Sequence, residues 1–199
     1  MNPNNDKPII DFETERLHIR AVKECDKEAY MALRIQNSMT PKAYEKIPGF
    51  RDYEWEGELN DDGDIFLSVF LKPEELFVAS ASIQHYNKAA IEIGYDVVKE
   101  YHKQGIATEL IKGLVKEIHR IFSDARIIIT TDRDNAASRR VAEKCGGTLT
   151  GFDNSIISRI YEIAKEGFEG KGMENDEEYR KIMESIEEDK NSVCVYELP

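Results

Sequence analysis

The hydrophobic pattern is clearest between residues 91 and 122, where a strand-like alternation gives way to a helical repeat. Apolar and polar residues alternate at its start, with Ile91, Ile93, Tyr95 and Val97 on one face. This two-residue period is that of a strand. After a polar turn at 99–104, apolar residues recur every three or four positions, at Ile106, Leu110, Ile111, Leu114, Val115, Ile118 and Phe122. The spacing predicts a long helix that begins at Gly105 and buries one face.

Weaker periodicities predict further elements before and after this segment. Strands are predicted at residues 12–22, 65–71, 76–86, 127–131, 152–154 and 192–197. Helices are predicted at 25–37 and 41–46, and from a cap at Asp134 or Asn135 to Gly146. The run at 127–131 is continuous and β-branched, which is typical of a strand buried on both faces and parallel to the central strand. The strands between 65 and 98 should form an antiparallel meander.

The turn before the long helix has the composition of an anion site. The first turn of a helix leaves backbone N–H groups without partners, and the positive end of the helix dipole lies behind them. Gly105 and Ala107 keep side chains small there, so a phosphate could approach the backbone. The chain has neither a Walker loop nor a G-x-G-x-x-G fingerprint. From this segment alone, an ordinary strand–helix crossover is an equal alternative.

Three segments carry a family resemblance. They are TERLHIR at residues 14–20, HKQGIA at 102–107 and NAASRRVAEKCG at 135–146. In this order they resemble the opening T-E-R-L-x-L-R strand, the Q/R-x-x-G-x-G/A pyrophosphate loop and the N-x-x-S…K-x-G segment of the GNAT superfamily of N-acetyltransferases. The resemblance is to the branch that acetylates ribosomal-protein N-termini and polyamines. Two residues depart from the pattern: His102 replaces the usual Arg or Gln, and Gly147 replaces an aromatic residue.

The resemblance implies a single α/β domain at residues 9–199, after a loose tail at 1–8. Its sheet should be mixed and mostly antiparallel, with six to seven strands and helices on both faces. A helical, acidic insertion is expected at 155–190, before the last strand. Between Glu166 and Lys190 there are ten acidic and four basic residues, which is half of the net charge of −12. Such a segment could select cationic acceptors, or it could only keep an amphipathic helix soluble.

The resemblance also implies acetyl-CoA as the co-substrate. Pantetheine would lie along the central strand at residues 95–98, where a backbone N–H would polarise the thioester carbonyl. The pyrophosphate would contact the amides of residues 103–108. The candidate coenzyme-binding residues are Tyr95, Asp96, Val97, Val98, His102, Lys103, Gln104, Gly105, Ile106, Ala107, Thr108, Asn135 and Ser138.

Acetyl transfer to an amine also needs a base and a proton donor. Glu92 is the leading base because a carboxylate near the middle of a sheet is unusual unless it has a function or a partner. An ion pair with a neighbouring cation is an equal alternative. His85 is the second candidate, since histidine titrates near neutral pH. The tyrosine that many GNAT enzymes use as the acid is Ala142 here, so the resemblance offers Ser138 as the donor to the thiolate. Ser138 could instead only form hydrogen bonds at its helix start.

Composition excludes several other classes of protein. The net charge of −12 argues against nucleic acid and anionic membranes as partners. Three cysteines without C-x-x-C spacing indicate neither a disulfide framework nor a zinc site, and no metal is expected. The N-terminus lacks the apolar core of a signal peptide, and no apolar run reaches membrane length. We therefore expect a soluble cytoplasmic protein, and its oligomeric state, a homodimer included, stays open.

The function expected from these features is acetyl transfer from acetyl-CoA to a primary amine, by direct attack and without a covalent enzyme intermediate. The acceptor could be a protein N-terminus, a polyamine or another small amine. The alternative is a non-catalytic acyl-CoA-binding module, which the departures at Ala142 and His102 favour.

Overall fold

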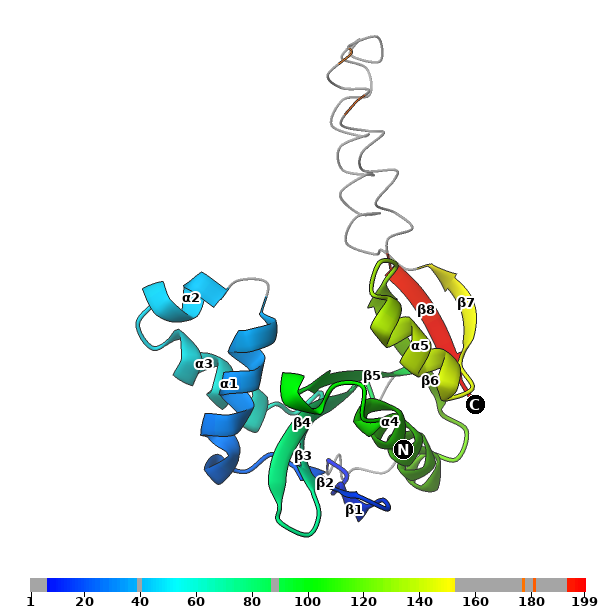
Figure 1. Ribbon diagram of the computed structural model, residues 1–199, viewed down its shortest axis with the longest axis horizontal. Helices are drawn as coiled ribbons and strands as arrows, with labels where there is room; N and C mark the ends of the chain where they lie inside the picture. Colours follow the sequence, from blue (N-terminus) through cyan, green and yellow to red (C-terminus); the bar gives the residue numbers. More distant parts are fainter. Residues whose placement is uncertain (1–6, 39–40, 87–89, 153–176, 178–180, 182–192) are drawn as a thin grey trace. The chain divides into compact units, whose positions relative to one another are not determined.

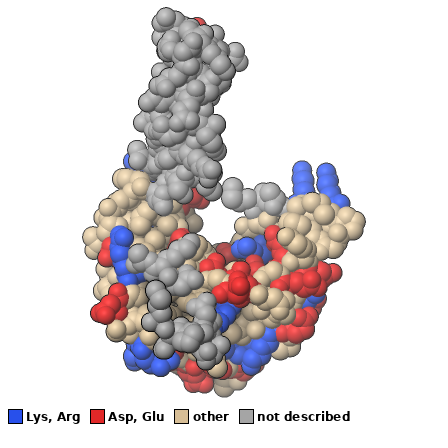
Figure 2. Space-filling model, turned by 180° about the vertical axis from the view of Figure 1, so that it is seen from behind, with Lys and Arg blue, Asp and Glu red and all other residues tan. Residues whose placement is uncertain are grey.

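The computed structural model describes residues 7–38, 41–86, 90–152 and 193–199, together with Glu177 and Lys181. The chain divides into two compact units, Met1–Ile128 with Leu198–Pro199 and Ile129–Glu197, whose elements are labelled in Figure 1. No helix in the described ranges is long and apolar enough to cross a membrane. On the face drawn in Figure 2, acidic and basic side chains are interspersed.

The first unit contains most of the sheet. Its strands are β1 (Asp11–Glu13), β2 (Leu17–Ala21), β3 (Ile65–Leu71), β4 (Leu76–Gln84), β5 (Ala90–Val97) and the start of β6 (Arg126–Asp132). They are hydrogen-bonded in this order. Each neighbouring pair is antiparallel except β5 and β6, which are parallel. This confirms the mixed, mostly antiparallel sheet and the predicted parallel strand after the long helix.

Helices cover both faces of this part of the sheet. They are α1 (Lys27–Asn37), α2 (Pro41–Lys46), α3 (Phe50–Leu59) and α4 (Ile106–Ile121), with short 3-10 helices η1 (Glu24–Asp26) and η2 (Lys99–Tyr101). Side chains alternate along β5, so Ile91 and Ile93 are buried on the α4 face. Asp96 points to the other face, where the amide of Asn37 at the end of α1 donates to it at 2.9 Å. Figure 1 shows α1 and α3 on one side of the strands and α4 on the other.

The second unit is smaller and contains most of β6 and β8 (Val193–Leu198), with α5 (Ala136–Lys144) and β7 (Thr148–Phe152). In it β8 lies between β6 and β7, and β7 runs antiparallel to β8. Ala142, Cys194 and Tyr196 form its buried cluster. The strand predicted at 152–154 begins earlier, at Thr148, directly after the glycine pair that ends α5. The predicted insertion at 155–190 lies outside the described residues except for Glu177 and Lys181, which are helical and form an ion pair at 2.9 Å.

The single strand expected at 12–22 is wrong, because β1 and β2 form a hairpin. The chain turns at Thr14, whose N–H donates to the Leu17 carbonyl at 2.8 Å and whose hydroxyl accepts from the Leu17 N–H at 3.1 Å. The Glu109 carboxylate of α4 accepts from the Thr14 hydroxyl at 2.6 Å and from the Arg16 N–H at 2.8 Å. With this split, the described residues form eight strands, where six to seven were expected.

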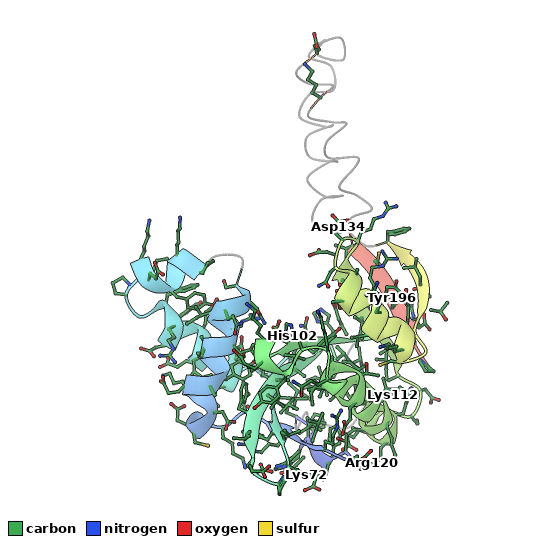
Figure 3. All side chains as sticks on the ribbon, in the orientation of Figure 1. Lys72, His102, Lys112, Arg120, Asp134 and Tyr196 are labelled. Atoms are coloured by element: carbon green, nitrogen blue, oxygen red, sulfur yellow. The ribbon has the colours of Figure 1, made fainter. Side chains whose placement is uncertain are left out.

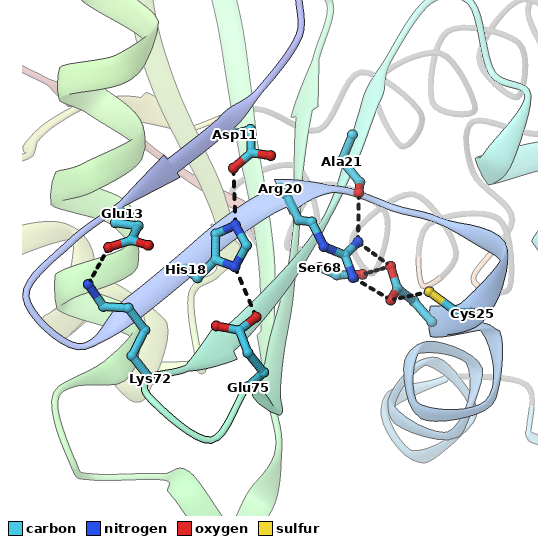
Figure 4. A network of polar contacts seen from close by, with 10 residues as sticks. Asp11, Glu13, His18, Arg20, Ala21, Cys25, Ser68, Lys72 and Glu75 are labelled. Carbon is cyan, nitrogen blue, oxygen red and sulfur yellow. Dashed lines mark hydrogen bonds and ion pairs between the residues drawn. The ribbon is translucent and has the colours of Figure 1, made fainter.

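A buried ion pair joins β2 to the start of α1 (Figure 4). The Arg20 guanidinium donates to both carboxylate oxygens of Asp26 at 2.7 Å, and Ser68 of β3 donates to the same carboxylate at 3.0 Å. Burial opposes the charge of Asp26, but the hydrogen bonds from Arg20, the Lys23 N–H and Ser68 hold its pKa below the ordinary value. The pair fixes the entry of α1 over the face of the sheet that carries Asp96.

His18 connects β2 to two neighbouring segments. Its Nδ1 lies 2.9 Å from Glu75 Oε2 in the β3–β4 hairpin, and its Nε2 lies 3.0 Å from Asp11 Oδ1 in β1 (Figure 4). The hydrogen bond with Glu75, supported by that with Asp11, raises the pKa of His18 above 6.5.

The free energy of unfolding should therefore depend on pH through His18. Because the pKa is raised in the folded state, the imidazolium stabilises the fold fully below about pH 6.5, and this contribution is lost as the pH rises through the folded-state pKa. By urea denaturation, the difference between wild type and His18→Gln should be larger at about pH 6 than at about pH 9. Equal differences at the two pH values would show that the imidazole charge contributes nothing.

Candidate functional site

The turn between β5 and α4 has two residues in left-handed backbone conformation. Gly105 caps α4 with φ of 82°, and Lys103 has φ of 60°. Glycine adopts this conformation freely, whereas a lysine there is strained and needs support from its surroundings. Ile106 and Ala107 follow in the first turn of α4, where backbone N–H groups have no partner within the helix. The turn therefore presents main-chain donors and the positive end of the α4 dipole.

Side chains of the loop hold the turn itself. His102, labelled in Figure 3, has its Nε2 2.8 Å from the Val97 carbonyl at the end of β5. A carbonyl only accepts, so this Nε2 carries the proton. The Gln104 amide donates to the Glu100 carbonyl at 2.8 Å. At the position where the family usually has Arg or Gln, this chain thus has a histidine that contacts the main chain.

Sequence reasoning missed two residues that meet this loop, Arg16 and Glu109. The Arg16 guanidinium donates from Nε to Glu109 Oε2 at 2.7 Å and from Nη1 to the Gln104 carbonyl at 3.2 Å. Burial raises the pKa of Glu109, but the hydrogen bonds from Thr14 and Arg16 outweigh it, and the pKa lies below the ordinary value. Glu109 is therefore ionised and anchors the guanidinium beside the loop. The available signal was the placement of Arg16 in the T-E-R-L segment.

β5 pairs with β4 along one edge and with β6 along the other. Its antiparallel ladder with β4 runs to Val97, and its parallel ladder with β6 pairs Ala90 with Arg126, Ile91 with Ile127 and Glu92 with Ile128. The stretch from Ile93 to Val97 therefore belongs to the part of β5 that is held by β4. Tyr95, Asp96 and Val97, three of the predicted coenzyme contacts, lie in this stretch, and Val98 follows it with its N–H donating to the Val78 carbonyl at 2.9 Å.

Both candidate bases lie at one end of the β4–β5 ladder. Glu92 is half-buried and stands opposite Gln84 of β4. His85 is the next residue after Gln84, and its backbone N–H donates to Asp64 Oδ1 at 2.9 Å. Gly94 follows Glu92 on the same face, and a Cβ there would lie 2.6 Å from the Ser82 hydroxyl oxygen. The structure therefore places Glu92 on a polar surface, on the face of β5 opposite α4.

The other two predicted contacts, Asn135 and Ser138, belong to the second unit. The Asn135 side chain accepts from the Ser138 N–H at 3.0 Å, which confirms Asn135 as the N-cap of α5. Ser138 is half-buried in the first turn of this helix. Ala142, at the position of the family's usual tyrosine, is fully buried. Their roles toward a coenzyme stay predictions. Among the residues described here, no group of three or more His, Cys, Asp or Glu could hold a metal ion.

Comparisons with known proteins agree with this arrangement. The family model described as the acetyltransferase (GNAT) domain matches residues 16–148. A GNAT-family acetyltransferase from Bacillus anthracis is 20% identical, with a TM-score of 0.62 over 95% of this chain and 98% of that one. A ribosomal-protein α-N-acetyltransferase in complex with coenzyme A is 21% identical, with a TM-score of 0.62 over 75% and 89%.

A third similar structure is spermidine N-acetyltransferase from Vibrio cholerae in complex with CoA and spermine. It is 16% identical, with a TM-score of 0.59 over 70% of this chain and 85% of that one. At these identities the likeness is one of fold. No curated protein sequence matches this chain significantly.

Proposed function

Because the chain belongs to the acetyltransferase (GNAT) family, it is an acetyl-CoA-dependent N-acetyltransferase, and we propose that its acceptor is a primary amine that attacks the thioester directly. The observation that carries the proposal is the loop between β5 and α4. Gly105 gives it an open start, its amides provide donors, and Lys103 adds a cation within it. These features fit the diphosphate of CoA, since anions bind at helix starts without a bulky side chain.

We assign the acyl end of the coenzyme to β5. We place an extended pantetheine along the strand at residues 95–98, where it would run as a further strand would. A main-chain N–H in this stretch would polarise the thioester carbonyl and stabilise the oxyanion that forms on attack. The chemistry then needs no covalent enzyme intermediate.

Glu92 is the proposed base. It stands on β5 at the last pair with β6, on the polar face that also carries Gly94 and Asp96. A carboxylate in this position can take a proton from the acceptor's ammonium group, directly or through one water, so that the neutral amine attacks the thioester. His85, at the same end of the ladder, is the second candidate. For the leaving thiolate we keep Ser138 as the proposed donor, since Ala142 has no proton to give.

A cationic acceptor is supported by carboxylates on the first unit's α1 face. Asp96 projects there from β5, and Glu58 of α3 is buried beside Tyr30 and Arg34 of α1. Burial raises the pKa of Glu58 above its ordinary value. A hydrogen bond from Tyr30 and the positive charge of Arg34 lower this pKa but do not outweigh burial. Glu58 Oε2 is buried and has no hydrogen-bond partner among the described residues. The partly exposed carboxylate of Asp96 on this face would favour an ammonium group over an anionic acceptor.

The net charge of −12 argues against nucleic acid and anionic membranes as partners, and we propose a cytoplasmic enzyme whose partners are amines. The acidic segment between Glu166 and Lys190 would add to the attraction of a cation, and a homodimer is compatible with this function.

The test is release of free thiol from acetyl-CoA in the presence of an amine panel. The panel pairs each alkyl monoamine with the diamine of equal length, and adds a peptide with a free N-terminus and its N-acetylated twin. We expect thiol release that depends on the amine and is faster with the diamine than with its monoamine twin. Binding of CoA without amine-dependent thiol release from any member would favour a non-catalytic acyl-CoA-binding module.

A further inference from the structure

We propose that Arg16 is a positioning residue for the coenzyme diphosphate, acting through the peptide unit between Gln104 and Gly105. The inference rests on the proposed function and extends it to a residue outside the loop. Arg16 lies in the turn after β1, and it reaches the loop from a distance of 88 residues along the chain. Its side chain is 43% exposed, so it lies beside the loop and remains accessible to solvent.

The first step is the orientation of one peptide plane. Arg16 Nη1 donates to the Gln104 carbonyl at 3.2 Å. In a trans peptide the C=O and the following N–H point in opposite directions. The carbonyl is held toward Arg16, so the N–H of Gly105 points away from it. This N–H then adds to the donors in the first turn of α4.

The second step is the packing of Gly105 against the guanidinium. A Cβ on Gly105 would lie 3.4 Å from Arg16 Nη2, so the guanidinium stands beside the space that a side chain at this position would enter. The φ of 82° at Gly105 requires the carbonyl before it to hold a defined direction. Arg16 therefore supports the left-handed turn as well as the peptide plane.

The third step is the anchor of Arg16 itself. Glu109 accepts from Arg16 Nε at 2.7 Å, and its other oxygen accepts from the Arg16 N–H at 2.8 Å and the Thr14 hydroxyl at 2.6 Å. The carboxylate neutralises the guanidinium, so Arg16 brings little net charge to the loop. Its contribution is orientation, which requires the planar fork that lysine lacks.

Calorimetric titration with CoA and with 3′-dephospho-CoA tests the proposal, since both ligands keep the diphosphate. Arg16→Ala should weaken both by about 10-fold, the effect of one lost charge-assisted hydrogen bond. Arg16→Lys should not restore the affinity. A loss confined to CoA would overturn the proposal, because Arg16 would then contact the 3′-phosphate, and so would unchanged affinity for both.

Glu109→Gln separates orientation from charge. It raises the net charge beside the loop by one, so a purely electrostatic role of Arg16 predicts tighter binding of CoA. Loss of the anchor predicts weaker binding, which is the result we expect, and tighter binding would overturn the proposal. Arg120→Ala is the matched control, since Arg120 pairs with Glu117 at 2.7 Å at the other end of α4 (Figure 3) and should leave CoA affinity unchanged. If the unmutated protein binds CoA but acetylates no amine, the proposed function is refuted, while the role of Arg16 in CoA binding stands.

Discussion

Replacing Glu92 with Gln is expected to lower turnover by about 100-fold or more, the usual contribution of a positioned general base. Gln keeps the size and the hydrogen-bonding shape of the side chain but cannot accept a proton at neutral pH. Glu92 stands near the start of β5, opposite Gln84 of β4 and Ile128 of β6. Affinity for CoA, which we assign to the loop and the strand backbone, should stay at the wild-type value.

The measurement is the pH–rate profile of both proteins with a saturating amine. Wild type should lose activity on the acidic side, where the base is protonated, and Glu92→Gln should lack this limb. Glu117→Gln, which removes the carboxylate that pairs with Arg120 on α4, should retain wild-type turnover. If Glu92→Gln keeps wild-type turnover across the pH range while His85→Gln loses it, His85 is the base.

Gly105→Val is expected to weaken CoA binding by about 100-fold, because one or two charge-assisted hydrogen bonds to the diphosphate are lost. A β-branched residue is a steric outlier at a φ of 82°. The turn must therefore change its backbone conformation, and the new side chain also meets Arg16. The change affects both the orientation of the amides and the space that a phosphate needs.

A second glycine in the chain controls for backbone strain. Gly49 caps α3 with φ of 76°, and a Cβ there would meet nothing within 4 Å. Gly49→Val should lower the free energy of unfolding by about 1–3 kcal/mol, as Gly105→Val should. Calorimetry should find wild-type CoA affinity for Gly49→Val only. Equal affinity in both variants would place the phosphate site away from this loop.

The central strand–turn–helix was predictable from sequence because its signals are local. The alternation in β5 and the apolar repeat of α4 each belong to a single element, and Gly105 marks the start of the helix. The same holds for the N-cap at Asn135, where the side chain and the N–H that it binds are three residues apart. The position of Glu92 on the face opposite Ile91 and Ile93 also followed from the strand period.

The missed features depend on contacts between distant segments. The hairpin at Thr14 is held by Glu109, which is 95 residues away, so the apolar period alone read as one strand. The contact of Arg16 with the loop could not be predicted, because no local pattern shows that the first hairpin lies beside the start of α4. The hydrogen bond between the His102 side chain and the Val97 carbonyl was likewise not predicted, because no sequence period indicates it.

The most direct test of the central claim is a mass measurement on both enzyme and amine after a short reaction with acetyl-CoA. The account predicts that the amine gains the mass of one acetyl group for each thiol released, while the enzyme mass stays unchanged throughout. A stoichiometric acetyl-enzyme that forms before the product, or an amine that gains no mass while CoA stays bound, would contradict it.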